Sequence, residues 1–394
     1  MERRGVQLPF PTLAHHGHIT SRCKIVGKTQ RRPASLDHRD NASLFSWYYT
    51  RVRTEHCDNG RSDEGGEDHV GPHCHTRVSA RDGLQHELEF VATDRKLAMI
   101  RAFSEAGFSS IEVTSFAHPL YVPQFVDADE LLRALADRPS AELVAVVMNE
   151  RAVERAVRAQ QAGAGPDLIG VAVSASDAHS LKNVHKTRDE HKREVAKMAA
   201  AALRAHLPIE GAVATAWGCP FTGPVPFWHV LDLVQFYCDL GIHTITLADT
   251  TGLATPTSVT ERIGQLLVRY PNITFRAHFH DTHGTGIANS IAAITAGIRH
   301  LDSSFGGLGG NPPRIQYSLG YTGNVVTEDL ICVLNGMGYE TGLDLDKVLE
   351  AAELVEQVLE RPLHGHVLRA GPPWKRLDDP EVTQLMESNG LRLS

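Results

Sequence analysis

From about Thr76 onward, short apolar runs alternate with longer segments in which apolar residues recur every three or four positions. The short runs are typical of buried strands, whereas the longer segments have the periodicity of amphipathic helices. Gly107 follows one such segment and predicts its C-terminal end. The pattern predicts strands at 75–83, 109–116, 141–148, 167–176, 210–218, 244–250, 274–281 and 300–307, and helices at 93–108, 127–137, 151–164, 188–206, 227–241, 258–270 and 286–297. About eight strands alternating with helices favour an α/β fold of the TIM (β/α)8 barrel type over an open doubly wound sheet.

Both ends of the chain differ from this alternating region. Residues 1–74 have no sustained periodicity and are rich in His, Arg, Asp and Gly, which predicts a poorly structured N-terminal extension. The barrel domain is predicted at 75–371, including two further helices at 327–338 and 345–361, and residues 372–394 are predicted to form a C-terminal tail. His69, His73, Cys74 and His75 could bind zinc, but their spacing fits no tetrahedral template. We therefore interpret them as incidental surface residues.

Composition and charge exclude some classes of partner. The chain has 394 residues, 42% of them hydrophobic, and a formal net charge of −8. Such a protein has no general attraction to nucleic acid or anionic membranes, so a small-molecule partner is expected. The sequence has no run of about 18 apolar residues and no secretory signal, so a cytoplasmic location is expected. The alternative is the mitochondrial matrix, because the first residues are basic and poor in acidic residues, as in a transit peptide. The six cysteines lack paired spacing and are expected to be reduced thiols.

The chemistry of a TIM barrel takes place at the C-terminal ends of its strands. At the end of the 274–281 strand, His278 and His280 are two positions apart, so both side chains are expected on the same side of the strand. Two converging imidazoles indicate a metal site, and a hydrogen-bonded structural pair is the alternative.

Charged residues also lie in or near other predicted strands. Arg81 and Asp82 end the first strand beside Gly83, although a surface turn would use the same residues. Glu112 lies inside the second strand, where a buried carboxylate is costly unless it is paired, so a functional role is favoured. Asp249 ends a later strand and has the same interpretation, with capping of the following helix as the alternative.

A glycine-rich loop leaves the last strand, with the sequence GGLGGNPPRIQYSLGYTGN from 306 to 324. Its glycines are expected over the mouth of the barrel, where backbone mobility permits opening and closure. Asn324 at the end of the loop offers a carbonyl ligand for a metal, and the alternative is an N-cap for the helix that follows.

A series of longer motifs occurs in unbroken order through the barrel region: RDGLQHE (81–87), EVTSFAHPLYVPQFVDADELL (112–132), GCPFTGPVP (218–226), LADTTGLATP (247–256), HFHDTHGTGIANS (278–290), GGLGG (306–310) and TGNVVTEDL (322–330). Together they resemble 3-hydroxy-3-methylglutaryl-CoA lyase, a metal-dependent TIM-barrel lyase of the DRE-TIM superfamily. The resemblance implies one divalent cation bound by Asp82, His278, His280 and Asn324. These ligands suit Mg²⁺ or Mn²⁺, and they suit Zn²⁺ less because no thiolate is present.

The reaction implied by the resemblance is retro-Claisen or retro-aldol cleavage of a 3-hydroxyacyl-CoA to a keto product and a thioester enolate. The metal would hold the substrate hydroxyl, and a base assisted by His278 or Asp249 would remove its proton. Arg81 would neutralise the enolate oxygen, and Glu112 would orient that arginine or a metal-bound water. Two further residues match polar positions near the family's substrate site: Gln85 and Asn183.

The sequence departs from the family at Asn311, where the lyases have a cysteine that donates or shuttles a proton. An amide cannot deliver a proton near neutral pH, and a missing general acid costs a factor of about 10² to 10⁴ in rate. In one hypothesis Tyr317, Tyr321 or a metal-bound water replaces the cysteine, and the longer loop fits a different substrate. In a second, the protein is a DRE-TIM aldolase or a Claisen-type condensing enzyme. In a third, which the retained ligands argue against, it is a non-catalytic acyl-CoA-binding pseudoenzyme.

An acyl-CoA partner would need cations at the barrel mouth for its phosphates. Lys182, Lys186 and Arg314 are candidates by position, with ordinary surface roles as the alternative. The resemblance also suggests a homodimer, the commonest symmetric assembly.

Overall fold

The computed structural model describes residues 72–137, 139–310, 323–373 and 380–389. The N-terminal extension up to residue 71 lies outside these ranges. So do four residues of the glycine-rich loop that the sequence singled out: Asn311, Arg314, Tyr317 and Tyr321.

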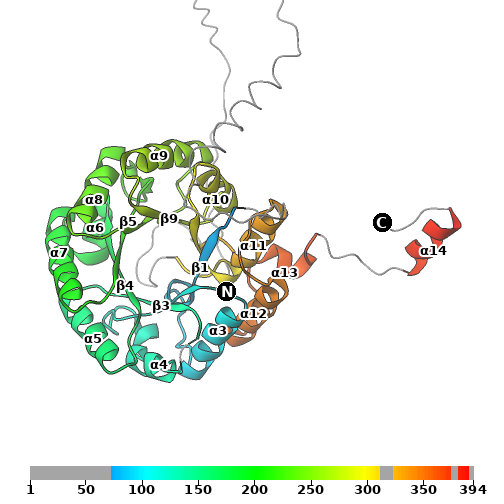
Figure 1. Cartoon of the computed structure of the whole chain (residues 1–394), viewed down its shortest axis with the longest axis horizontal. Coiled ribbons are helices and arrows are strands. Elements are labelled where there is room, and N and C mark those ends of the chain that lie inside the picture. Colours follow the sequence, from blue (N-terminus) through cyan, green and yellow to red (C-terminus); the bar gives the residue numbers. More distant parts are fainter. Residues whose placement is uncertain (1–71, 138, 311–322, 374–379, 390–394) are drawn as a thin grey trace, which may run out of the picture. The chain divides into compact units, whose positions relative to one another are not determined.

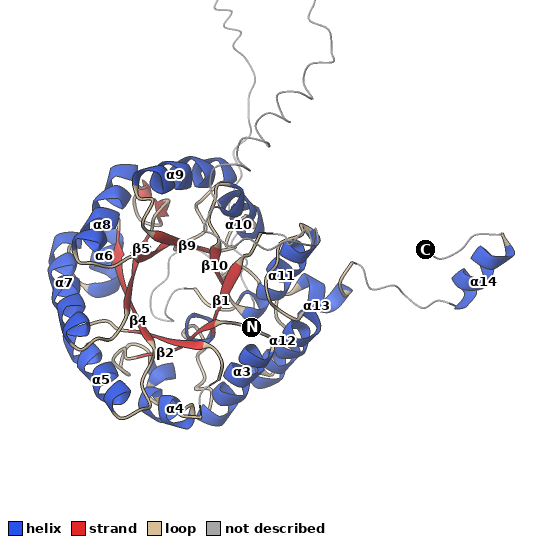
Figure 2. Cartoon of the chain, viewed as in Figure 1, coloured by secondary structure: helices blue, strands red, loops and turns tan. Residues whose placement is uncertain are grey.

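Eight parallel strands close into a barrel, which confirms the predicted TIM-barrel fold (Figures 1 and 2). The strands follow the order β1-β10-β9-β8-β5-β4-β3-β2, and β1 closes the ring by pairing with both β10 and β2. Their bounds are β1 (His75–Ser79), β2 (Ser110–Ser115), β3 (Glu142–Val146), β4 (Leu168–Ser174), β5 (Ile209–Ala214), β8 (Thr244–Asp249), β9 (Thr274–Phe279) and β10 (His300–Ser303).

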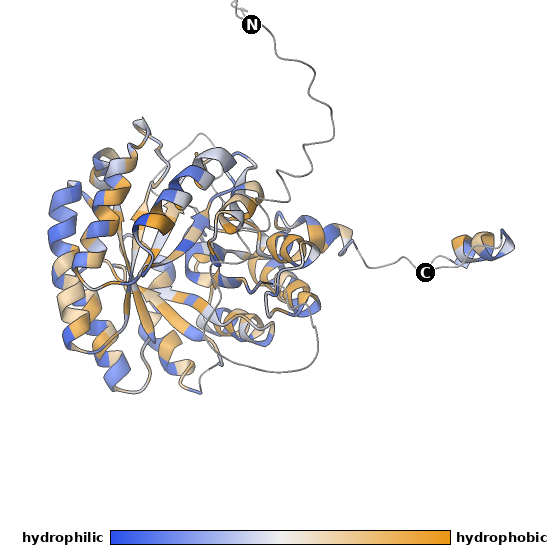
Figure 3. Ribbon diagram, turned by 45° about the horizontal axis from the view of Figure 1, so that its top comes forward, coloured by the Kyte–Doolittle hydropathy of each residue, from blue (hydrophilic) through white to orange (hydrophobic). Residues whose placement is uncertain are grey.

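Helices surround the strands, and their apolar faces are turned toward the barrel (Figure 3). Met99, Ile100 and Phe103 show the pattern in α3, where they are buried at helical spacing, and Gly107 follows the helix with a φ of 102° as its sequence position predicts. The helices that connect the strands include α3 (Thr93–Glu105), α4 (Ala128–Ala134), α5 (Glu150–Gln161), α7 (Arg188–Arg204), α8 (Phe227–Asp239), α9 (Pro256–Arg269) and α10 (Gly286–Thr295). After β10 come α11 (Thr327–Gly336), α12 (Leu345–Leu359), α13 (His366–Ala370) and α14 (Pro380–Ser388).

The first predicted strand ends earlier than expected. β1 stops at Ser79, and Arg81 and Asp82 lie in the short helix α2 (Ala80–Leu84) rather than in the strand. The Ser79 hydroxyl accepts a hydrogen bond from the Asp82 backbone N–H at 2.7 Å, which is the usual capping contact that starts a helix. The turn places both side chains at the C-terminal end of the barrel instead of alternating them across a strand. A further helix that the sequence did not predict, α6 (Asp177–Val184), follows β4.

The residues around the start of β1 have structural contacts in the described part of the chain. His73 lies 3.4 Å from a carboxylate oxygen of Glu340, and the His75 ring stacks on His300. Cys74 is buried and carries a free thiol. Across the described ranges, no helix has both the length and the apolar character needed to cross a membrane.

Candidate metal centre and active site

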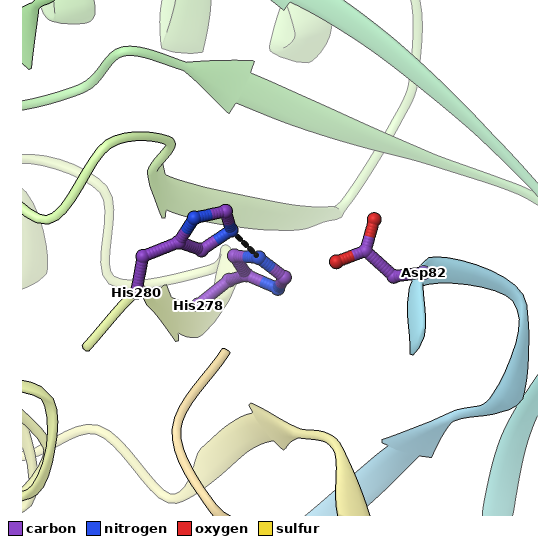
Figure 4. Close-up of side chains that lie close together, drawn as sticks. All are labelled: Asp82, His278 and His280. Atoms are coloured by element: carbon purple, nitrogen blue, oxygen red, sulfur yellow. Dashed lines mark hydrogen bonds between the residues drawn. The ribbon is translucent and has the colours of Figure 1, made fainter. Parts of the chain in front are cut away.

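Three side chains that can bind a metal meet at the mouth of the barrel (Figure 4). Asp82 belongs to α2, His278 lies in β9, and His280 follows the end of that strand. Their ligand atoms all lie within 4.8 Å of one another, and the Nε2 atoms of the two histidines are 3.1 Å apart. The structure therefore brings the two imidazoles together, as their spacing of two residues predicts.

Asn324 lies against this cluster. The Asn324 side-chain NH₂ donates to Asp82 Oδ2 at 2.6 Å and to the Leu308 carbonyl at 2.8 Å. Its own side-chain oxygen is buried and has no hydrogen-bond partner within the described ranges, as expected of a group that needs a cation. The alternative role as an N-cap is wrong, because α11 begins at Thr327 and its N-cap is Val326. The four predicted ligands thus lie together and fit a divalent cation through two carboxylate or amide oxygen donors and two imidazoles.

A buried carboxylate that the sequence analysis missed, Asp302 of β10, lies behind His278. Its Oδ2 is 3.4 Å from His278 Nδ1, and its Oδ1 is 3.5 Å from Arg276 Nη1. Burial opposes the charge of Asp302, but Arg276 and Arg77 outweigh it and lower the pKa of that carboxyl to about 2. A charge inside the predicted strand 300–307 was a signal that could have identified it, by the same argument that identified Glu112.

The two histidines differ in their readiness to carry a proton. Burial and the neighbouring His278 lower the pKa of His280 to about 3, so His280 is neutral at physiological pH. Burial also opposes a charge on His278, but its hydrogen bond with Asp302 and that carboxylate's charge raise the pKa of His278. A neutral imidazole is the form that binds metal.

Arg81 is fixed at the edge of the cluster by three side chains. Arg81 Nε lies 2.9 Å from Glu112 Oε1, and its Nη1 lies 3.1 Å from Asp82 Oδ1 and 2.9 Å from Gln85 Oε1. Glu112 also accepts a hydrogen bond from the Ser79 hydroxyl at 2.7 Å. The buried charge of Glu112 is thus paired, as its position in a barrel strand requires.

Asp249 does not face the cluster. Its neighbours on β8, Thr246 and Ala248, line the interior cavity, whereas the Asp249 carboxylate accepts backbone hydrogen bonds from Leu253 at 2.9 Å and Ala254 at 3.0 Å. Burial raises the pKa of this carboxyl to about 6. Its contacts stabilise the turn before α9, but the N-cap of that helix is Thr255, so the alternative role as a helix cap is wrong. The charge of His278 partly offsets the rise in this pKa, and the role of Asp249 as an assistant to the base stays a prediction.

A cavity of about 730 Å³ opens beside the cluster, within the size range of ligand sites. Seven predicted site residues line it: Arg81, Asp82, Gln85, Glu112, Asn183, His278 and His280. The unpredicted helix α6 supplies part of the wall, including Asn183 and Lys182, and Lys186 just after the helix also lines the cavity. The two lysines are two of the three predicted phosphate cations. Lys186 Nζ also lies 2.5 Å from Glu194, which makes Lys182 the less engaged of the two cations.

The start of the glycine-rich loop is held against the metal cluster. The Gln85 side-chain NH₂ donates to the Gly310 carbonyl at 2.7 Å, while Asn324 holds the Leu308 carbonyl. Gly309 between them has a φ of +110°, and a Cβ there would lie 2.2 Å from the Asn324 side-chain nitrogen. Only glycine satisfies both the backbone conformation and this close approach.

The structure is a TIM barrel with a candidate metal site and a cavity at the C-terminal ends of its strands. The chain belongs to the HMGL-like family, whose model matches residues 75–355. It is 36% identical over 292 residues to the hydroxymethylglutaryl-CoA lyase YngG of Bacillus subtilis, covering 74% of this chain and 95% of that protein. The mitochondrial hydroxymethylglutaryl-CoA lyase of Homo sapiens is 34% identical over 293 residues, with 74% of this chain and 87% of the human protein covered.

Comparison with solved structures leads to the same family. The HMG-CoA lyase of Acinetobacter baumannii, in complex with coenzyme A and 3-methylmalate, superposes with a TM-score of 0.72 at 32% identity. The match covers 78% of this chain and 98% of that chain.

Proposed function

We propose that this chain is a divalent-metal-dependent carbon–carbon lyase acting on a 3-hydroxyacyl-CoA related to 3-hydroxy-3-methylglutaryl-CoA. The observation that carries the proposal is the group of Asp82, His278, His280 and Asn324 at one edge of a cavity that Arg81 also lines. Family membership supports the same activity, because the relatives named above are hydroxymethylglutaryl-CoA lyases.

Oxygen and imidazole ligands without a thiolate favour Mg²⁺ or Mn²⁺ over Zn²⁺ at this site. When bound, such an ion polarises the substrate's hydroxyl and a neighbouring oxygen and makes the hydroxyl more acidic. The ligands are partly prearranged for this role, because Asp302 holds His278 and the start of the glycine-rich loop holds Asn324.

We assign each of the remaining roles in the reaction to a residue of the chain. Of the two predicted assistants to the base, His278 lines the cavity and Asp249 does not, and we assign His278, held by Asp302, to assisting the base that removes the hydroxyl proton. Arg81 is the fixed cation for the negative charge that develops on the thioester oxygen when the carbon–carbon bond breaks. Glu112 and Gln85 hold the guanidinium in place, since each contacts it directly.

Protonation of the enolate needs an acid that Asn311 cannot supply. Tyr317 and Tyr321 remain the predicted donors from the chain, and they lie, like Asn311, outside the described residues. Coenzyme A as the acyl carrier is supported by the coenzyme A complex of the Acinetobacter lyase and by Lys182 on the cavity wall. Arg314 stays a candidate from the sequence alone.

Mass spectrometry of products provides the test. Purified protein is incubated with 3-hydroxy-3-methylglutaryl-CoA and Mg²⁺ or Mn²⁺, with a chelated sample as control. We expect metal-dependent formation of acetyl-CoA and acetoacetate over many turnovers. A folded, metal-loaded protein that cleaves neither this substrate nor its 3-alkyl homologues would refute the lyase function and favour the condensing-enzyme or binding-protein alternatives.

A further inference from the structure

The cavity beside the metal cluster extends along three strands of the barrel, and we call this part of it the hollow. The interior of a TIM barrel is ordinarily filled by layers of bulky, branched side chains and is a packed core. Here, C-terminal to the inward Glu210 of β5 and Thr246 of β8, the inward positions that line the cavity in three adjacent strands, β4, β5 and β8, carry only glycine or alanine. These residues line the cavity and stay partly exposed in the middle of their strands: Gly170, Ala172, Ala212, Ala214 and Ala248.

The alternation along these strands shows that the hollow is built into the sequence. Val213 of β5 and Leu247 of β8 alternate with the small residues, are at most 1% exposed and do not line the cavity. The outward positions are therefore packed as usual, and only the inward ones lack volume. At Gly170 an added Cβ would come no closer than 3.7 Å to another atom, which is ordinary contact and leaves room for a side chain.

The opposite half of the interior is polar. His278 and Asp302 face the cavity from β9 and β10, and Glu112 faces it from β2. Below them, Arg77 of β1 reaches across to Glu210 of β5, with Nη2 and Oε2 2.6 Å apart, and closes the floor with a neutral pair. The chamber above this floor thus has one wall of charges and metal ligands and one apolar wall, which Val146 and Met148 extend toward β3.

The chemistry of the proposed substrate matches this division. The carbon that bears the hydroxyl has four substituents: the hydroxyl itself, the thioester arm, the carboxylate arm and one alkyl group. The oxygen-bearing groups need cations and hydrogen-bond donors, and the polar wall provides them next to the metal ligands. The alkyl group is left for the Gly/Ala wall, where the small side chains and the free space at Gly170 admit a group longer than methyl.

We propose that the hollow half-barrel is a binding subsite for a C3 substituent larger than methyl, so that the preferred substrates are 3-hydroxy-3-alkylglutaryl-CoA thioesters with an extended apolar alkyl group. This inference rests on the lyase function proposed above. In the reaction the hydroxyl O–H and the C2–C3 bond break, and the bond's electron pair forms the enolate of the thioester. A proton returns to C2, so the products are acetyl-CoA and a 3-oxo acid that carries the alkyl group.

The test compares the methyl, ethyl, propyl and butyl members of this thioester series with the full-length, Mn²⁺-loaded protein. Acetyl-CoA is the common product, so one assay serves all four. Burial of one methylene is worth about fourfold in affinity, and we expect kcat/KM to rise on the order of 50-fold from methyl to butyl. Calorimetry with the corresponding free 3-hydroxy-3-alkylglutarates measures the same preference without turnover.

Ala212→Leu would fill the hollow and is expected to lower the butyl-to-methyl ratio of kcat/KM by at least tenfold. Ala200→Leu adds the same volume at an exposed position of α7 and should leave the ratio unchanged. Gly170→Ala, which the available space accommodates, is the milder variant if Ala212→Leu does not fold.

The outcomes separate the subsite from the activity. Binding that strengthens with alkyl length, without cleavage of any member, would support the subsite and refute the lyase function. Cleavage of the methyl compound with a flat or falling preference along the series would overturn the subsite while the lyase function stands. Equal binding of all four acids would overturn the subsite as well.

Discussion

Asp302 shows how a single buried carboxylate prepares the candidate metal site. It contacts the imidazole nitrogen of His278 that faces away from His280, and Arg276 and Arg77 compensate its charge. A carboxylate in this position fixes the ring orientation and the tautomer of a metal-binding histidine. Asp302 thus holds a ligand of the candidate metal site in position, and its contribution can be measured as a change in metal affinity.

We predict that Asp302→Asn lowers the affinity for Mn²⁺ by about 10- to 100-fold, because the amide holds the imidazole less firmly than the carboxylate does. Titration calorimetry of the metal-free protein with Mn²⁺ measures the change. Asp137→Asn removes a carboxylate from an exposed ion pair with Arg101 and is the matched control. An unchanged affinity in a variant that keeps its circular dichroism spectrum would show that Asp302 has no positioning role.

Side-chain alternation in strands explains which residues could be predicted. It placed His278 and His280 on one side, and the structure has them there. The same rule applied to β8 separates Asp249 from the inward-facing Ala248, but the inward side could be chosen only once the neighbouring strands were known. The partnership of Asp302 with His278 likewise depends on the register between β9 and β10, which no local pattern contains.

At the scale of elements, the repeating strands and helices were predictable and the connections were not. Periodicity and buried apolar runs identified most of the eight barrel strands, whereas β1 and β10 carry one aliphatic residue each, Val78 and Leu301, and followed from the alternation of the elements. The short helix α2 was missed because the single turn Ala80–Leu84 is too short to show a helical period. α6 was missed for a similar reason, since its eight residues include only two buried ones, His179 and Ser180, and neither is apolar.

The start of the glycine-rich loop is the element most closely tied to the metal site. We predict that Gly309→Ala weakens Mn²⁺ binding at least tenfold, because the new methyl group would displace Asn324 and strain a backbone with positive φ. Calorimetric titration with Mn²⁺ again measures the effect.

Gly163→Ala separates crowding from backbone strain. Gly163 has a φ of +77° and no atom within 4 Å of an added Cβ. This control should lose about 1 kcal/mol of stability through backbone strain and keep its Mn²⁺ affinity. Equal metal binding by Gly309→Ala and the control would show that the loop does not hold Asn324 in place.

At the scale of the whole molecule, closure of the barrel assembles the site. Asp82 and Asn324 are 242 positions apart in sequence, and they meet because β1 pairs with β10. Local patterns cannot supply this contact, and only the resemblance of motifs named both residues as ligands of one ion. The homodimer and the cytoplasmic location remain predictions, and size-exclusion chromatography with light scattering would test the former.

Closure of the fold also buries Glu328 of α11 completely, with Gly306 as a backbone donor at 3.1 Å. Burial, with the charges of Asp329 and Glu356, raises the pKa of Glu328 from 4.5 to about 7 despite that hydrogen bond. Below pH 4.5 both the folded and the unfolded state hold the proton. Between pH 4.5 and about 7 the unfolded state releases it first, so the free energy of unfolding falls with rising pH and levels off above 7.

Glu328→Gln removes this ionisation while keeping the shape of the side chain. We therefore predict that it raises the free energy of unfolding at pH 8 by on the order of 1–3 kcal/mol relative to its effect at pH 5. Urea denaturation at the two pH values measures the difference, and Glu350→Gln on the exposed face of α12 should show none. If the two variants respond alike to pH, the buried carboxylate does not limit stability at alkaline pH, and the decline must arise from other groups that the fold buries.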